Sequence, residues 1–360
     1  MRKIIIIVLL CMTILASISI SFLPMGYSDD SEVVLSAVSV LGGAKTGNNY
    51  WPLRLMTSPL YSESILIASK VTGSIKVGWR LLNSIFYVLI GLIFYLILEI
   101  LFKNKRTAFI GTLFLVTNYG IVVSGLSFLV DIGGWFFYLL SLYFLLLYVD
   151  GDENNRQNKW LLLSSLSVGL GGLMKEFGFL GFIAIFLFVI YENYPDILKI
   201  LKKIFLPIVI SFSPALLLFI CIYFRFHYSY LDWFGENIAK AVYASRIVEY
   251  IKSLGSLFNL LSFFVLGGLY YFFKERQSLV EKKYYQFIIF VCLSSLPAFI
   301  WPAITQRILF ILVPSATIIA CFCIKKLDKY WYIFIPILFL YFLTSLYMDS
   351  FILNHINLPF

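Results

Sequence analysis

Ionisable side chains stand at the edges of long apolar stretches in four places along this chain. Charged groups at the depth of a membrane, or at its outer edge, are expensive to desolvate, so each place merits a functional hypothesis. Carboxylates there exchange protons or hold cations, whereas lysine and arginine hold phosphates. The four groups are Asp29, Asp30 and Glu32; Asp131; Lys175 and Glu176; and Arg307.

The first group places three carboxylates within four residues, directly after an apolar stretch. Their mutual repulsion favours protonation of at least one of them, which suits a general base or a cation site. The alternative is a solvated segment that opens a helix, because Ser, Asp and Glu are all favourable in a first helical turn. Both interpretations stand on the sequence alone.

Asp131 is a lone carboxylate between apolar residues and glycines, where one apolar stretch turns into the next. It is either the N-cap of the following helix or a functional acid. In such apolar surroundings a serine would cap the helix at a lower desolvation cost than a carboxylate, so we favour a functional role for Asp131.

Lys175 and Glu176 separate two apolar stretches and follow a glycine-rich run. Neighbouring residues on one helix do not face each other, so we expect each charge to find its own partner. The glycines would let another helix approach closely. The alternative is a polar hairpin tip. Arg307 could bind a phosphate through two N–H groups of its guanidinium at once, or extend to lipid headgroups.

The composition requires a membrane around this chain. Hydrophobic residues make up 61% of the 360 residues and charged residues only 13%, about half the usual share in soluble proteins. A span needs about 20 apolar residues, although shorter ones occur. Eleven candidate spans lie roughly at 4–23, 77–101, 107–126, 130–149, 160–174, 177–191, 205–224, 256–273, 285–302, 308–324 and 331–347. We predict an all-α, polytopic transmembrane bundle.

The basic residues set the predicted orientation and argue against nucleic-acid binding as the cause of the net charge of +9. They gather in every second connection, as expected of cytoplasmic loops. This pattern places the N-terminus in the cytoplasm and the C-terminus outside, with residues 4–23 as an uncleaved anchor. All four ionisable groups then lie on the extracytoplasmic side.

We expect one integral membrane domain over residues 1–360, without a soluble C-terminal domain. Two long extracytoplasmic loops are predicted at 24–76 and 225–255. An amphipathic stretch at Pro59–Lys70 in the first loop is expected to lie along the membrane interface. The second loop carries aromatic residues and an amphipathic stretch at Ile238–Ile251, which favour a role in anchoring the loop to the membrane.

Carboxylates and cations gathered at one outer rim match the needs of sugar transfer from a lipid phosphate. A carboxylate takes the proton of an attacking hydroxyl, while a cation stabilises the charge on the departing phosphate. The alternatives are a multi-span transporter or lipid-linked sugar flippase, and a polysaccharide polymerase or ligase. Transporters commonly show repeated halves and charges near mid-membrane, which this sequence lacks.

Several motifs, in this order, make the chain resemble the GT-C class of polytopic glycosyltransferases that use polyprenyl-phosphate sugars. That class includes the protein O-mannosyltransferases and the aminoarabinose lipid A transferases. The resemblance covers most of the first 180 residues and rests on the acidic pair after the first span, Arg80 to Ser84, Asp131, and Gly169 to Glu176; Arg307 and Pro314 extend it.

The resemblance implies roles for these residues. Asp29 or Asp30 would be the general base; the usual pair is Asp-Glu, so the choice between the two aspartates stays open. Asp131 would position the acceptor or share a divalent cation with Asp29, the one cofactor left open. The expected substrate-binding residues are Glu32, Arg80, Asp131, Lys175, Glu176 and Arg307.

The resemblance also implies the partners and the stereochemistry. The donor would be a polyprenyl-phosphate-linked sugar, transferred with inversion at the sugar carbon. The acceptor would be a hydroxyl of a protein, lipid or polysaccharide. Membrane lipids surround the protein, and no nucleic acid is expected as a partner.

Overall fold

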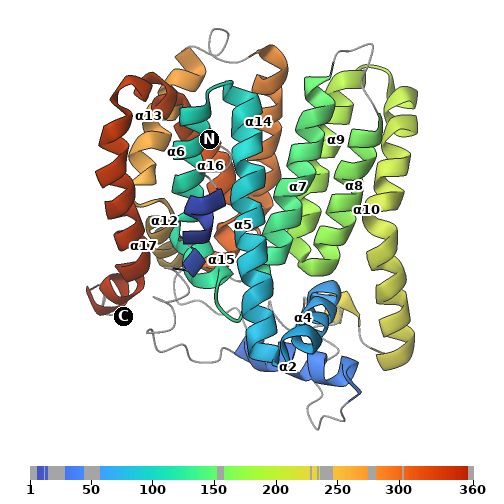
Figure 1. The fold of residues 1–360 in the computed structure, drawn as a ribbon. Coiled ribbons are helices and arrows are strands. Elements are labelled where there is room, and N and C mark those ends of the chain that lie inside the picture. Colours follow the sequence, from blue (N-terminus) through green and yellow to red (C-terminus); the bar gives the residue numbers. More distant parts are fainter. Residues whose placement is uncertain are drawn as a thin grey trace.

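The computed structural model describes residues 6–11, 13–14, 29–43, 57–151, 158–227, 229–232, 235, 246–274, 281–301 and 304–355. Side chains are described for these residues except 29–33, 226, 246 and 345–355. Every regular element within these ranges is a helix, and the helices stand side by side as a bundle (Figure 1). The predicted fold class, an all-α membrane bundle, is confirmed.

The helices follow the apolar stretches, with shifts of a few residues at most of their ends. The longer elements are α2 (Asp29–Leu41), α4 (Pro59–Thr72), α5 (Ile75–Phe102), α6 (Lys105–Val116), α7 (Asp131–Asp150), α8 (Asn158–Met174), α9 (Gly181–Asn193), α10 (Ile197–Phe226), α12 (Arg246–Phe258), α13 (Leu261–Lys274), α14 (Lys282–Ser295), α16 (Leu312–Lys326) and α17 (Phe334–His355). The short ones are the π-helical η1 (Gly120–Gly125), the 3-10 helices η3 (Glu176–Leu180), η4 (Leu296–Phe299) and η5 (Asp328–Ile333), and α15 (Gln306–Leu309).

The predicted count of eleven spans is not confirmed. Within the described residues, four helices are long and apolar enough to cross a membrane, or up to six if two sharply bent helix pairs each count as one span. Several expected spans are shorter or broken in the structure. The predicted span at 107–126, for example, is α6 followed by η1, and the one at 256–273 meets an 85° bend between α12 and α13.

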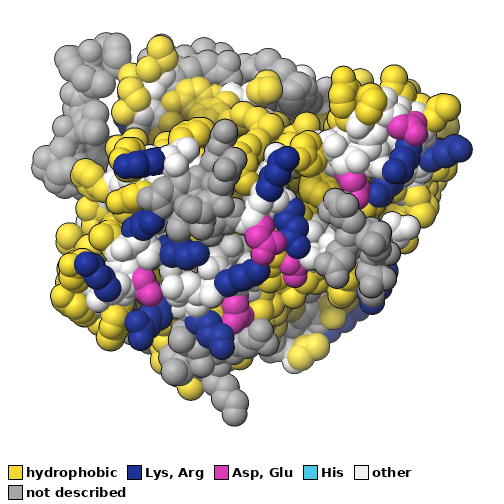
Figure 2. Space-filling model, turned by 90° about the horizontal axis from the view of Figure 1, so that it is seen from above, with side chains coloured by type: hydrophobic (Ala, Val, Ile, Leu, Met, Phe, Trp, Pro, Cys, Tyr) yellow, Lys and Arg dark blue, Asp and Glu magenta, His cyan; other side chains and the backbone are white. Residues whose placement is uncertain are grey.

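The two ends of the bundle differ in chemistry. At one end, α5, α7 and α16 finish and α10 and α14 begin (Figure 1). Lys and Arg side chains spread across this end, with fewer acidic ones among them (Figure 2). We call it the basic face. The other end carries α2, α4 and the first turn of α7, and we call it the site end.

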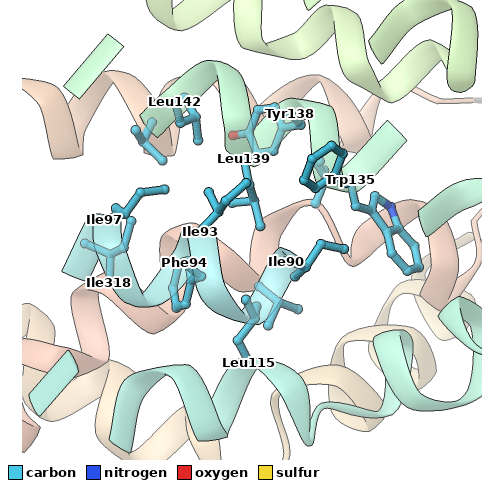
Figure 3. Close-up of a cluster of buried hydrophobic side chains, with 14 of the residues drawn as sticks. Ile90, Ile93, Phe94, Ile97, Leu115, Trp135, Tyr138, Leu139, Leu142 and Ile318 are labelled. Carbon is cyan, nitrogen blue, oxygen red and sulfur yellow. The ribbon is translucent and has the colours of Figure 1, made fainter. Parts of the chain in front are cut away.

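Residues from helices far apart in the sequence form the core between these ends. Ile93 and Phe94 of α5, Leu139 of α7, Leu115 of α6 and Ile318 of α16 lie together in one apolar cluster (Figure 3). All five side chains are buried. Their packing fixes α7, and therefore Asp131 at its start, relative to α5 and α16.

The two predicted amphipathic stretches are helical where the structure describes them. Pro59–Lys70 falls within α4, whose Tyr61 and Ile65 are fully buried, so one side of α4 belongs to the core of the bundle. Of Ile238–Ile251, the part from Arg246 onward begins α12, and residues 236–245 lie outside the described ranges.

The chain breaks its helix at Lys175, so the apolar stretches at 160–174 and 177–191 are two separate helical segments, as predicted. α8 ends at Met174, and Lys175 is extended, with φ −164° and ψ 141°. A Cβ atom added at Gly178 would lie only 2.1 Å from the backbone of Gly171, so side chains at these two positions would prevent η3 from folding back against α8. The predicted use of glycines for close approach is confirmed in this contact.

Candidate active site

Asp131 is the first residue of α7 and is buried. The cap of α7 is Val130, without a side-chain hydrogen bond, so the interpretation of Asp131 as an N-cap is wrong. The helix start still favours a negative charge at this position. Oδ2 of Asp131 is buried and has no hydrogen-bond partner among the described residues.

Arg307 faces this carboxylate from α15. Its Nη1 atom lies 3.9 Å from Oδ2 of Asp131. The Arg307 side chain is 30% exposed, whereas that of Asp131 is 2% exposed. The guanidinium thus lies between a buried carboxylate and the exterior, where it can also contact an anion that enters from outside.

Lys175 and Glu176 form an ion pair, with Nζ and Oε1 2.9 Å apart and both side chains 9% exposed. The expectation that each would find a partner elsewhere was wrong. It assumed a continuous helix, in which neighbouring side chains diverge. Lys175 is extended instead, and this lets the two side chains turn toward each other.

Two contacts join this pair to Asp131 and Arg307. A Cβ atom added at Gly134, one turn into α7, would lie 2.7 Å from Cβ of Lys175, so Lys175 rests directly on the first turn of α7. The rings of Phe177 and Trp301 lie 5.9 Å apart, which connects η3 to the segment before α15. Asp131, Lys175, Glu176 and Arg307 therefore gather at the site end.

A second carboxylate oxygen in this group is also buried without a hydrogen bond among the described residues. It is Oε2 of Glu176. Buried polar atoms in proteins are nearly always hydrogen-bonded, so two such oxygens in one cluster need partners from elsewhere.

Sequence reasoning missed the polar groups that hold the chain before Asp131. The hydroxyl of Tyr61 in α4 donates to Oδ1 of Asn83 in α5. Nδ2 of Asn83 donates to the carbonyl oxygens of Ser127, at 2.5 Å, and Leu129, at 3.3 Å. A buried amide within an otherwise apolar span was the available signal for Asn83.

The charge of Asp131 also acts on the Tyr61 phenol. Burial raises the pKa of the Tyr61 phenol well above its usual value, and the negative charge of Asp131 raises it further. The phenol therefore stays protonated at physiological pH and keeps its hydrogen bond to Asn83. A Cβ atom on Gly133 would lie 2.6 Å from the Tyr61 ring, so α4 and the first turn of α7 are in close contact.

Arg80 lies one turn before Asn83 on α5 but is exposed. Its guanidinium carbon lies 5.0 Å from the centre of the Phe128 ring, in the segment that leads to Asp131. This contact places Arg80 beside that segment. Its predicted part in substrate binding stays a prediction.

Asp29 and Asp30 begin α2, and Glu32 follows in the same turn. Their side chains lie outside the described residues, so the predicted general base and the part of Glu32 in substrate binding stay predictions. A helix start agrees with the structural alternative without excluding the functional one. α2 packs against α4, the helix that carries Tyr61.

A divalent cation also stays a prediction. Among the described side chains, no three His, Cys, Asp or Glu residues form a metal-binding group. Asp131 would contribute one carboxylate, which is too few for a closed site by itself.

The second long loop returns toward this cluster through Tyr230, a residue that the sequence analysis did not single out as functional. Burial raises the pKa of its phenol, and the charge of Glu176 raises it further, so the two side chains lie within electrostatic reach. The Tyr230 ring stacks on Phe219 of α10, with ring centres 5.5 Å apart.

Comparisons with known proteins give a family match for part of the chain and a shared fold for nearly all of it. Residues 57–222, somewhat less than half of the chain, match the profile of the dolichyl-phosphate-mannose-protein mannosyltransferase family. This segment contains Tyr61, Asn83, Asp131, Lys175 and Glu176. No curated protein sequence matches the chain.

Two solved structures have a similar fold. ArnT from Cupriavidus metallidurans, bound to undecaprenyl phosphate, aligns with a TM-score of 0.61 and 13% identity over 89% of this chain and 60% of that chain. The Archaeoglobus fulgidus oligosaccharyltransferase, in complex with zinc and sulfate, aligns with a TM-score of 0.56 and 13% identity over 94% of this chain and 53% of that chain. This chain spans less than two thirds of either protein. The predicted resemblance to GT-C glycosyltransferases is confirmed.

Proposed function

We propose that this protein is a membrane glycosyltransferase that moves a sugar from a polyprenyl phosphate to an acceptor hydroxyl on the extracytoplasmic side. The observation that carries the proposal is the gathering of Asp131, Lys175, Glu176 and Arg307 at one end of a GT-C-like bundle. The matched family profile supports the reaction class, and the lipid bound to ArnT supports the donor class.

The proposed reaction is a direct displacement. The acceptor oxygen bonds to the anomeric carbon while the bond from that carbon to the phosphate oxygen breaks, and the electron pair leaves with the polyprenyl phosphate. The proton of the hydroxyl passes to Asp29 or Asp30. Arg307 and Lys175 stabilise the charge that develops on the departing phosphate. Attack opposite the leaving group inverts the sugar carbon.

Asp131 and Glu176 have a different role from the proposed general base. Asp131 orients the Arg307 guanidinium through their 3.9 Å pair, and Glu176 does the same for Lys175. Oδ2 of Asp131 and Oε2 of Glu176, which have no hydrogen bond among the described residues, would accept hydrogen bonds from sugar hydroxyls. Arg80 and Glu32 would complete the set of substrate-binding residues. Asp29 and Asp131 would hold a divalent cation if the reaction uses one, and that cation would neutralise phosphate charge.

The distribution of basic residues supports an extracytoplasmic position for the site end. Connections at the basic face carry most of the lysines and arginines, and such loops remain in the cytoplasm (Figure 2). The site end then faces outward, together with the end of α17. Labelling of single cysteines with an impermeant reagent tests this orientation at position 30 and at position 80, where Arg80 is exposed at the site end. Protection at both positions, together with labelling at the exposed position 105 of the basic face, would overturn it.

A transfer assay tests the function. Membranes that contain the protein would be incubated with labelled polyprenyl-phosphate sugars, and the wild type compared with Asp29→Asn and Asp30→Asn. Loss of transfer in one variant identifies the base, whereas normal transfer in both contradicts the assignment. Asp196→Asn is the matched control, because Asp196 caps α10 far from the site end and asparagine caps equally well. Movement of the lipid-linked sugar across the membrane without transfer would instead indicate a flippase.

A further inference from the structure

A cavity lies between α6 and α17 near the basic face, away from the candidate active site. Its volume is about 560 Å³, and its walls are almost wholly apolar side chains of these two helices and of η5. This size lies within the range of ordinary ligand pockets. We call it the α6–α17 cavity.

The cavity is elongated along the bundle. Arg106 lines it in the first turn of α6, and Leu113 lines it two turns further into the membrane. Trp331 and Leu338 line the opposite wall over a similar length of η5 and α17. Seven helical residues rise about 10 Å, so the long direction of the cavity follows the direction of lipid chains.

The mouth of the cavity is positively charged and aromatic. Arg106 and Trp331 are both exposed, and among the described residues that line the cavity Arg106 alone is charged. An exposed tryptophan next to apolar wall residues is typical of the level of the lipid headgroups. Lys105 and Lys329 stand beside these two residues in the sequence and add to the positive charge at this end.

The acidic residue nearest in sequence is Asp328, whose Oδ1 is buried without a hydrogen bond among the described residues. Oδ2 of Asp328, the first residue of η5, accepts a hydrogen bond from Nδ2 of Asn104 at 3.2 Å. Oδ1 of Asn104 accepts from the backbone N–H groups of Arg106 and Thr107. These bonds hold the start of α6 against η5, so the two walls of the cavity are joined at its mouth.

We infer that the α6–α17 cavity holds one acyl chain of an anionic phospholipid from the leaflet at the basic face, with the lipid phosphate against Arg106. The apolar walls fit a hydrocarbon chain, and the charge at the mouth selects a headgroup with net negative charge. The site is separate from the proposed donor site and does not depend on the proposed function.

Lipid retention by the full-length protein tests this inference. Detergent-purified protein would be equilibrated with equal amounts of phosphatidylglycerol and phosphatidylcholine, washed, and analysed by native mass spectrometry. The wild type is expected to retain phosphatidylglycerol preferentially. Arg106→Gln should lower this preference roughly tenfold, the effect of losing one charge-assisted hydrogen bond. Lys105→Gln is the matched control, because Lys105 is an exposed neighbour that does not line the cavity.

A second variant tests the chain-binding part. Leu338→Trp fills the cavity without changing its charge and should abolish retention of the selected lipid. If Leu338→Trp does not fold, Leu113→Phe is used instead to fill the cavity. Equal retention of both lipids by the wild type would overturn the inference. So would an unchanged preference in Arg106→Gln, an equal loss in Lys105→Gln, or displacement of phosphatidylglycerol from the wild type by a polyprenyl phosphate.

Discussion

The Arg307 guanidinium lies 3.9 Å from the Asp131 carboxylate, although α7 and α15 are far apart in the sequence. The acid is buried and the base is partly exposed. An ion pair of this kind holds the arginine in one orientation while it leaves part of the cation accessible. The pair therefore connects the buried start of α7 to a group that can meet a substrate.

Neutralising this pair should impair transfer more than folding. Arg307→Gln is expected to lower the turnover rate by about 10²–10³, the usual effect of losing one group that stabilises developing charge. Asp131→Asn should act in the same direction, and the double variant should lose less than the sum of both effects. Lys252→Gln is the control, because Lys252 is also a partly exposed basic residue paired with a carboxylate, that of Glu249 on α12. Full activity in Arg307→Gln would contradict the role of Arg307.

Single and double variants of the Lys175–Glu176 pair distinguish effects on stability from effects on transfer. Removal of one partner leaves a buried charge alone and should destabilise the protein by about 3–5 kcal/mol. The double variant Lys175→Met/Glu176→Leu should recover much of this stability, but it should not recover transfer. Thermal unfolding in detergent and the transfer assay measure the two effects. Recovery of activity together with stability would show that the pair has no part in the reaction.

Gly134 keeps Lys175 close to α7. A Cβ atom at this position would lie 2.7 Å from Cβ of Lys175, so Gly134→Ala should push the two segments apart. Such overpacking costs about 1–3 kcal/mol and should lower both the melting temperature and the transfer rate. Gly255→Ala in α12 is the matched control, because its Cβ atom would meet no atom within 4 Å. Equal melting temperatures for the two variants would refute the close contact.

The Tyr61 hydroxyl supports the segment before Asp131 through Asn83. Tyr61→Phe leaves Oδ1 of Asn83 without this donor and should cost about 1–3 kcal/mol of stability. Tyr330→Phe, at an exposed tyrosine, is the control.

The raised pKa of Tyr61 also predicts how its contribution to stability depends on pH. Its pKa is raised in the folded protein, so its contribution to stability is fully present below the ordinary tyrosine pKa and is lost as the pH rises from there through the raised value. The stability difference between wild type and Tyr61→Phe should therefore stay constant from pH 6 to 9. A difference that disappears within this range would mean that Tyr61 ionises there.

The sequence predicted the fold class and the main cluster because both depend on apolar lengths and on rare charges. Asp131, Lys175, Glu176 and Arg307 were conspicuous as ionisable residues at the edges of apolar stretches. Their partners were not predictable, since the ion pair of Lys175 depends on a backbone break rather than on residue spacing. Tyr61 and Tyr230 were missed as functional residues because aromatic residues are common throughout this chain, and only the folded structure brings them beside acids.

The length of α8 sets the depth at which chemistry would occur. The helix begins at Asn158 near the basic face and ends after 17 residues, a rise of about 25 Å against a hydrocarbon layer of about 30 Å. Lys175 and Glu176 would then sit below the lipid headgroups rather than above them. An acceptor must lower its hydroxyl to that level, which favours hydroxyls on lipids or on pliable extended peptides over those fixed on the surface of a folded domain.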